Sequence, residues 1–336
     1  MPGGNPADVD SGAVYRALGP DQVLNALESL GWACDGRLLA LNSYENRVYQ
    51  VGIEDAEPVI AKFYRPGRWT DAAIGEEHAF ARELADEEIP AVPPLADDSG
   101  KTLHHIGGYR VAVYPRRGGR APELDDLDNL EILGRHMARV HAVGAVRPFA
   151  HRPVLDVASF GDASRDYLLA NDWLPGHLTA AYESVSRDAL ERVRACYARA
   201  GRVGAIRLHG DAHPGNILWR DGVPNLVDFD DSRMGPAIQD LWMFLSGDRP
   251  DRTVQLDAIL EGYCQFREFD PRELNLIEAL RTLRIMHHAA WIARRWDDPA
   301  FPPAFPYFAE PRFWEDHVLT LREQMAAMDE APLVWS

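Results

Sequence analysis

Cysteines and long apolar runs are scarce in this chain. Three of its 336 residues are cysteines (Cys34, Cys196 and Cys264), and no two of them form a C-x-x-C pair. This scarcity argues against a disulfide framework and against a cysteine-based zinc site, so we expect small buried thiols. No segment reaches the roughly 18 to 20 consecutive apolar residues that span a bilayer, and the N-terminus lacks the pattern of a signal peptide. We therefore expect a cytoplasmic protein with no membrane partner.

Positive charge is also in short supply. The chain has 35 lysines and arginines against 52 aspartates and glutamates, a formal net charge of −17. This excess of negative charge argues against nucleic acid or an anionic membrane as the main partner. With 46% hydrophobic and 26% charged residues, the composition is that of a folded globular protein. A length of 336 residues is sufficient for about two domains.

The N-terminal third predicts a small antiparallel sheet. Residues 1–19 show no periodicity and predict a flexible tail, after which an apolar repeat from Pro20 predicts a short helix. Segments rich in β-branched and aromatic residues predict four strands, at 37–41, 47–51, 59–64 and 109–114. One helix, with Thr70 as its N-cap, interrupts these strands.

Helical periodicity dominates after residue 115. Segment 115–120, rich in glycine and arginine, interrupts the strand pattern, and we place the lobe boundary there. Helices are predicted at 127–143, 178–200, 238–245, 254–266 and 273–296, whereas 206–219 and 225–230 predict strands between polar loops. The fold class is therefore α+β, with a small antiparallel β lobe at 20–115 and a large helical lobe at 116–336.

Two polar motifs in the second lobe carry chemistry. His209, Asp211 and Asn216 form an H-x-D-x-x-x-x-N motif, and Asp228 follows at the end of an apolar strand. Carboxylate and amide oxygens are hard ligands that suit magnesium, and one carboxylate remains to accept a proton. Kinases of the protein-kinase superfamily use this arrangement. It predicts Asp211 and Asp228 as catalytic residues, with Asn216 and Asp228 as the ligands of Mg2+.

Other interpretations compete for the same residues. His209 and His213 are four residues apart, as in a zinc pair on a helix, but the glycines and proline around them oppose a helix. The run that begins at Asp228 resembles the start of a calcium loop, yet its sixth position is Arg233 and its twelfth is Gln239. Solvated acidic turns would explain either motif alone, but not both motifs at this spacing.

The predicted sheet supplies a candidate phosphate-binding lysine. Lys62 stands in an otherwise apolar strand, and the next helix carries Glu77 on its inward face, where a carboxylate requires a cationic partner. An ion pair of this kind holds a lysine against the α- and β-phosphates of a nucleotide. Glu76 is the alternative partner, although it should point sideways. The strand that contains Val113 leads to the lobe connection, where backbone groups would meet adenine.

Several runs of the chain match a known pattern: residues 41–50 (LNSYENRVYQ), 62–66 (KFYRP) with Arg68 and Trp69, 208–211 (LHGD), 216–222 (NILWRDG) and 239–243 (QDLWM). In these runs the chain resembles the bacterial stress response kinase A family, from about Pro20 to the C-terminal helix. The resemblance implies the two-lobed fold of aminoglycoside phosphotransferases. It also implies phosphorylation of protein serine and threonine, autophosphorylation included, with ATP and Mg2+.

The same resemblance implies roles for single residues. Asp211 corresponds to the proton acceptor, Asn216 and Asp228 to the magnesium ligands, and Ser43 to a position at the ATP site. No G-x-G-x-x-G stands between the first two predicted strands, where residues 42–46 (NSYEN) take its place. Such a loop still offers backbone N–H groups and the Ser43 hydroxyl to phosphates. Ser43 either only contacts phosphate or receives it.

A further aspartate in the second lobe also allows two interpretations. Asp240 either accepts backbone N–H bonds from the catalytic loop, and so braces it, or caps a helix.

These observations predict an ATP- and Mg2+-dependent serine/threonine protein kinase with a stress-response role. In this interpretation the first lobe binds nucleotide and the second carries catalysis and the acceptor. The alternative is a small-molecule phosphotransferase acting on an aminoglycoside, choline or a similar amino alcohol. A pseudokinase that serves as a binding module is a third possibility, and the presence of Lys62, Asp211, Asn216 and Asp228 argues against it. We expect a monomer whose partners are ATP and proteins bearing serine or threonine.

Overall fold

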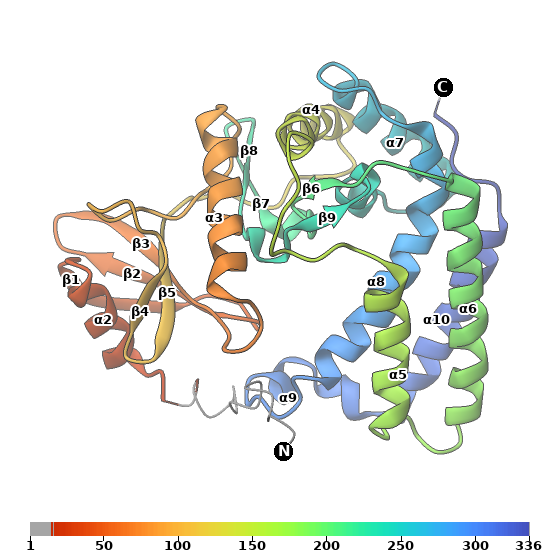
Figure 1. Cartoon of the computed structure of the whole chain (residues 1–336), viewed down its shortest axis with the longest axis horizontal. Helices are drawn as coiled ribbons and strands as arrows, with labels where there is room; N and C mark the ends of the chain where they lie inside the picture. The colour runs from red at the N-terminus through yellow and green to blue at the C-terminus, as the bar shows by residue number, and fades with distance from the viewer. Residues whose placement is uncertain (1–14, 16, 336) are drawn as a thin grey trace. The chain divides into compact units, whose positions relative to one another are not determined.

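The computed structural model describes residues 15 and 17–335 and divides into two compact units. Unit 1 consists of Met1–Arg120, Ala150–Arg152 and Ile217–Asp230, and unit 2 of Ala121–Phe149, Pro153–Asn216 and Asp231–Ser336. Unit 1 is built around an antiparallel sheet and unit 2 is mainly helical, so the predicted α+β class is confirmed (Figure 1). The assignment of one part to nucleotide binding and of the other to catalysis remains a prediction.

Ordered structure in unit 1 begins before Pro20. Residues 1–14 and 16 of the predicted flexible tail lie outside the described residues. Tyr15 and Leu18 are buried, and the Tyr15 hydroxyl donates a hydrogen bond of 2.9 Å to the carbonyl oxygen of Phe63. The tail prediction is therefore wrong for these two residues, because the core of unit 1 covers both apolar side chains.

The sheet of unit 1 has five antiparallel strands in the order β1-β2-β3-β5-β4. Its elements in chain order are α2 (Pro20–Ser29), β1 (Cys34–Ala40), β2 (Arg47–Ile53), β3 (Ala56–Phe63), α3 (Asp71–Asp86), β4 (His104–Ile106) and β5 (Tyr109–Pro115). The four predicted strands and the helix after Thr70 are all present. β4 has no counterpart among the predicted strands, because three residues are too few for a periodic pattern.

Alternation along the strands gives this sheet two different faces. Val59 and Phe63 of β3 point into the core that also contains the buried side of α2. Lys62 has the opposite parity and points to the other face, where Ala112 of β5 packs with Ile74 of α3. Figure 1 shows α2 and α3 on the two sides of these strands. The period of the strand thus places a lysine on the face that α3 covers.

A hairpin from the middle of the chain also belongs to unit 1. It consists of β7 (Ile217–Arg220) and β8 (Val223–Leu226). Backbone hydrogen bonds of 2.7 and 3.0 Å join Leu226 to Pro90 and Val92, in the segment that follows α3. Because these bonds hold β8, the residues that follow it, Asp228 among them, are carried by unit 1.

Unit 2 is mainly helical. Its helices and strands are α4 (Leu127–Gly144), α5 (Ala163–Ala170), α6 (Thr179–Ala200), β6 (Ile206–Leu208), β9 (Arg233–Gly235), α7 (Arg249–Tyr263), α8 (Ile277–Ala293), α9 (Phe301–Ala304) and α10 (Pro311–Asp329). Figure 1 shows α4 against α7, and α5, α6, α8 and α10 packed together. β6 pairs with β9 in a two-stranded antiparallel sheet.

The predicted helix at 238–245 is wrong. The segment forms two short 3-10 turns, Ala237–Asp240 and Trp242–Phe244. Most of its apolar residues are buried, but so is the Asp240 carboxylate, which accepts hydrogen bonds of 2.8 Å from the backbone N–H groups of His209 and Gly210. These bonds fix where the carboxylate must lie, and this tertiary requirement overrides the helical periodicity.

Burial of the cysteines differs from expectation. None of the three forms a disulfide, and only Cys196 is buried. Cys34 is half-buried, and Cys264 is exposed because it lies at the very end of α7. The prediction of buried thiols is therefore wrong for these two residues. Within the described chain, no helix is both long and apolar enough to cross a membrane.

Candidate active site

Lys62 is the centre of a buried charge cluster in unit 1. Its Nζ atom lies 3.4 Å from Oε1 of Glu77 on α3, and both side chains are almost fully buried. The predicted choice of Glu77 as the partner of Lys62 therefore agrees with the geometry. Burial disfavours the ammonium form, but the carboxylates of Asp228, Asp230 and Glu77 outweigh burial, so the pKa of Lys62 is raised well above its usual value.

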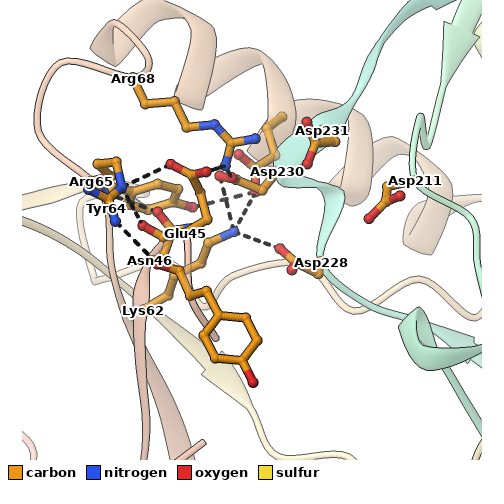
Figure 2. Close-up of polar contacts among 12 residues, drawn as sticks. Glu45, Asn46, Lys62, Tyr64, Arg65, Arg68, Asp211, Asp228, Asp230 and Asp231 are labelled. Atoms are coloured by element: carbon orange, nitrogen blue, oxygen red, sulfur yellow. Dashed lines mark hydrogen bonds and ion pairs between the residues drawn. The ribbon is translucent and has the colours of Figure 1, made fainter. Parts of the chain in front are cut away.

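Two aspartates that follow β8 complete this cluster. The Lys62 Nζ atom lies 3.0 Å from Oδ1 of Asp228 and 3.3 Å from Oδ1 of Asp230 (Figure 2). The two carboxylates differ in exposure, since the side chain of Asp228 is 51% exposed and that of Asp230 only 4%. Asp228 also has a φ of +60°, a conformation that L-residues seldom adopt. Backbone strain of this kind is common where a protein contacts a ligand.

The neighbouring acid, Glu76, has a structural role. Its carboxylate accepts hydrogen bonds of 2.6, 2.8 and 3.1 Å from the backbone N–H groups of Ala150, His151 and Arg152. The side chain of Arg152 is fully buried and donates to Oε2 of Glu77 at 2.8 Å and to the carbonyl oxygen of Asp230 at 2.6 Å. Glu77 thus lies between two cations, while Glu76 fixes the segment that supplies the second one.

The loop between β1 and β2 is tied to the segment after β3. The Arg65 Nε atom lies 3.0 Å from Oε1 of Glu45 and donates to the Glu45 carbonyl oxygen at 2.9 Å. Arg68 pairs with both Glu45 and Asp230, as Figure 2 shows. These contacts hold the loop between β1 and β2 in place, whereas a glycine-rich loop at this position would be flexible. Ser43 is half-buried in this loop, and its contact with phosphate remains a prediction.

Val113 lies apart from this cluster. It is buried in β5 opposite Ala61, and its carbonyl oxygen accepts a hydrogen bond of 2.7 Å from the backbone N–H of Leu95. Its proposed contact with adenine remains a prediction.

Asp211 and Asn216 lie in unit 2, on the loop after β6. Asp240 braces this loop through the two backbone bonds described above, which decides between the two interpretations of that residue. Gly210 has a φ of +86°, and a methyl group there would overlap the carbonyl oxygen of Asp231, so only glycine fits. The Asn216 Nδ2 atom donates to the Asp211 carbonyl oxygen at 2.9 Å, which leaves the amide oxygen of Asn216 to bind a cation.

Asp211 has a cationic neighbour on α8. The Arg284 Nη1 atom donates a hydrogen bond of 2.5 Å to Oδ1 of Asp211, and the His213 Nε2 atom lies 3.5 Å from Oδ2. Arginines on a helix of an acidic protein usually form a solvated or ion-paired face. Arg284 is ion-paired, but its partner is the expected catalytic base, which no local pattern could indicate.

The histidines and acids of these loops do not form a metal cluster of their own. Within residues 15 and 17–335, no group of three or more histidine, cysteine, aspartate or glutamate side chains is placed to hold a metal ion. Nδ1 of His209 and Nδ1 of His213 each accept a backbone N–H from their own loop. Magnesium does not require such a cluster, because it binds one or two protein oxygens together with phosphates and water. The carboxylate of Asp228 and the amide oxygen of Asn216 are donor atoms of this kind, and their role as ligands of Mg2+ remains a prediction.

The sequence pattern of the phosphotransferase enzyme family matches residues 37–277 of this chain. The chain belongs to that family. It is 43% identical over 324 residues to stress response kinase A of Salmonella choleraesuis strain SC-B67, across 96% of this chain and 98% of that protein. It has the same identity and coverage with serine/threonine protein kinase RdoA of Salmonella typhimurium strain LT2. The predicted resemblance to the stress response kinase A family is therefore confirmed.

Solved structures of small-molecule kinases share the fold. Amicoumacin kinase hAmiN, solved with AMP-PNP, Ca2+ and Ami, superposes with a TM-score of 0.74 at 18% identity and covers 96% of this chain and 98% of its own. A microcompartment-associated aminopropanol kinase superposes with a TM-score of 0.68 at 18% identity and covers 91% of this chain and 98% of its own. At this identity the likeness concerns the fold alone.

Four side chains of the site were missed by the analysis of the sequence. Arg152 and Arg284 lie in segments without a motif, so no signal in the sequence could have found them. Asp230 belongs to the D-F-D-D run that begins at Asp228. An aspartate two residues after a predicted metal ligand could have been considered as part of the site. Arg68 is part of a matched run, but its pairing with Asp230 depends on the fold.

Proposed function

We propose that this protein is an ATP- and Mg2+-dependent serine/threonine protein kinase that also phosphorylates itself and acts in a stress response. The observation that carries the proposal is the buried Lys62, held between Glu77 of α3 and the exposed carboxylate of Asp228. A kinase needs this lysine to hold nucleotide phosphates, and an acid beside it for the metal. The relative named serine/threonine protein kinase RdoA supports a protein as the acceptor.

Each residue has a definite part in the proposed reaction. Lys62 binds the α- and β-phosphates of ATP, Glu77 keeps the ammonium in place, and Ser43 contacts phosphate from its loop. Asn216 and Asp228 hold Mg2+, which neutralises charge on the phosphates. Asp211 accepts the proton of the acceptor hydroxyl as its oxygen bonds to the γ-phosphorus and the bond between that phosphorus and ADP breaks.

The fold supports this division of labour. Lys62, Glu77, Asp228 and Ser43 belong to unit 1, so we assign nucleotide binding to it, while Asp211 and Asn216 belong to unit 2. Val113 of β5 is the proposed neighbour of adenine. We place the kinase in the cytoplasm, because a reaction that consumes ATP requires a compartment that supplies it, and we expect it to be a monomer.

A small-molecule acceptor is the alternative function. Its support is the fold shared with an aminopropanol kinase and an amicoumacin kinase. Both acceptors require the same base and the same metal, so only the product distinguishes them.

The test of the proposed function is the substitution Asp211→Asn. The amide of asparagine cannot act as a base. We therefore expect phosphoryl transfer to fall by roughly a hundredfold to ten-thousandfold, while nucleotide binding changes little. Full-length protein is incubated with labelled ATP and Mg2+, with and without a generic protein acceptor. Phosphoserine and phosphothreonine are then identified by mass spectrometry, with Ser43 examined separately.

The control is Asp188→Asn on α6, where the carboxylate pairs with Arg187. This variant should phosphorylate protein as the unmodified chain does. Turnover by Asp211→Asn within a few-fold of the unmodified chain would remove Asp211 from its role. ATP turnover that appears only with an amino alcohol or an aminoglycoside, and no label on protein, would favour the alternative function.

A further inference from the structure

The cation beside the expected catalytic base carries an inference about the acceptor, and this inference rests on the proposed kinase function. Arg284 donates to the Asp211 carboxylate from the middle of α8, at 2.5 Å. Its side chain is 39% exposed and that of Asp211 is 21% exposed, so an incoming acceptor can reach both. Among the described acids, Asp211 is the one with which Arg284 forms an ion pair.

The His213 Nε2 atom lies 3.5 Å from Oδ2 of Asp211, so Arg284 is the partner of this carboxylate that is charged at every pH. Arg233 pairs with Asp231 at 2.6 Å, so neither adds an unbalanced charge. Desolvation lowers the pKa of His288, which lies in the field of both Arg284 and Asp211. The negative charge of Asp211 is therefore balanced by Arg284 before any acceptor arrives.

The ion pair between Asp211 and Arg284 determines which charge on the acceptor is favourable. The acceptor hydroxyl must approach Asp211, and Arg284 then has to give up at least part of its bond to the carboxylate. A cationic acceptor would meet the guanidinium with like charge and offer it nothing in return. A carboxylate next to the hydroxyl would instead bind the released guanidinium in a charge-assisted hydrogen bond.

We propose that the acceptor is a serine or threonine next to an acidic residue of a protein, and that Arg284 binds that acid. Successive Cα atoms lie about 3.8 Å apart, so the acid belongs directly before or after the acceptor residue. The exchange frees Asp211 to take the hydroxyl proton. The hydroxyl oxygen then bonds to the γ-phosphorus of ATP, the bond to the β-phosphate oxygen breaks, and ADP leaves.

Three peptides that differ only in the two residues flanking a single serine test the proposal. These two residues are both aspartate, both asparagine or both arginine, in an otherwise identical neutral sequence. The full-length protein with ATP and Mg2+ should phosphorylate the aspartate peptide with a kcat/KM roughly tenfold above that of the asparagine peptide, as one charge-assisted hydrogen bond contributes. The arginine peptide should be the poorest of the three.

Substitutions of Arg284 should change this order. Arg284→Gln should bring the aspartate and asparagine peptides to equal kcat/KM, Arg284→Lys should keep part of the preference, and Arg284→Glu should favour the arginine peptide. Arg281→Gln is the matched control, because Arg281 lies one turn earlier on α8 and pairs with Glu278. It removes the same charge from the same helix and should leave the preference intact.

The outcomes separate this inference from the proposed function. Equal kcat/KM for the three peptides with the unmodified protein would overturn the acidic acceptor while the protein kinase function stands. An equal fall in kcat/KM for every peptide in Arg284→Gln, with the preference retained, would also overturn it. That result would indicate that Arg284 contacts the transferred phosphate instead. Phosphorylation of no peptide and of no protein, with turnover of an amino alcohol, would overturn both.

Discussion

Carboxylates that accept backbone N–H bonds recur in this protein. Glu76 binds three successive amides at 150–152, Asp240 binds two in the catalytic loop, and Glu273 accepts the backbone N–H of Ile238 at 2.8 Å. Since Ile238 lies in the same 3-10 turn as Asp240, Glu273 supports the residue that supports the loop. At the scale of the residue, the catalytic loop is therefore held by two acids in series.

Glu273 makes the stability of the protein depend on pH. Burial raises its pKa from 4.5 to about 7, against the opposing effect of the bond from Ile238. Between these two values the folded protein binds more protons than the unfolded chain, so the free energy of unfolding falls as the pH rises from about 4.5 to about 7. The contribution is fully present below the lower value and lost above the upper one, and amounts to roughly 3 kcal/mol at most.

Glu273→Gln should remove this dependence, because glutamine keeps an acceptor oxygen but does not titrate. The difference in free energy of unfolding, variant minus unmodified protein, should grow in favour of the variant between pH 5 and pH 8. Urea denaturation at several pH values measures it. A difference that is constant with pH would show that Glu273 does not titrate in this window.

At the scale of the element, α4 and α7 approach unusually closely. Gly134 of α4 lies against the carbonyl oxygen of Ile259, and Gly262 of α7 lies against the carbonyl oxygen of Glu131. A methyl group at either glycine would overlap the backbone of the other helix. Both glycines are therefore required by the crossing, although glycine lowers helix propensity.

Gly262→Ala should destabilise the protein, because the two backbones must separate to admit the methyl group. We expect a loss of about 1–3 kcal/mol in the free energy of unfolding. The matched control is Gly75→Ala on α3, where the added methyl group would have no neighbour within 4 Å. That variant should gain about 0.5–1 kcal/mol from helix propensity. Thermal and urea denaturation of both variants test the pair, and a stabilised Gly262→Ala would contradict the close crossing.

At the scale of the whole molecule, the division into two units does not follow the order of residues along the chain. The β7–β8 hairpin, with Asp228 after it, belongs to unit 1, although the residues on both sides belong to unit 2. The proposed nucleotide lysine, Lys62, and one proposed metal ligand, Asp228, therefore lie in the same unit, joined by an ion pair of 3.0 Å. Binding of Mg-ATP should stabilise the folded protein through this pair.

The stabilisation should depend on both the metal and Asp228. Mg-ATP at about a hundred times its dissociation constant contributes about 2.7 kcal/mol, which raises the thermal midpoint. EDTA should remove the Mg2+-dependent part of that rise, and Asp228→Ala should not show it at all. Asp221→Asn, at the exposed turn of the same hairpin, is the control and should behave as the unmodified protein. An equal Mg2+-dependent rise in Asp228→Ala would remove Asp228 from the metal site.

Much of the architecture follows from the sequence alone. Period-2 and period-3.6 patterns are local properties, so they determined the strands around Lys62, the helix after Thr70 and the α+β class. The H-x-D-x-x-x-x-N motif and the later Asp228 predict a kinase-like site, because their spacing is set along one stretch of chain. The inward face of α3 favoured Glu77 over Glu76 by the same local argument, and the ion pair with Lys62 agrees with it.

The tertiary structure alone decided the contacts that join distant segments. Arg152 meets Glu77 from 75 residues away, and Arg284 meets Asp211 from 73 residues away. Neither arginine belongs to a sequence motif, because each pairs with a carboxylate that only folding brings close to it. For the same reason residues 238–245 are not a helix, since their backbone follows the bonds that Asp240 makes to the catalytic loop. Which buried charges pair depends on which side chains lie close together in the folded protein, and periodicity along the chain does not indicate this proximity.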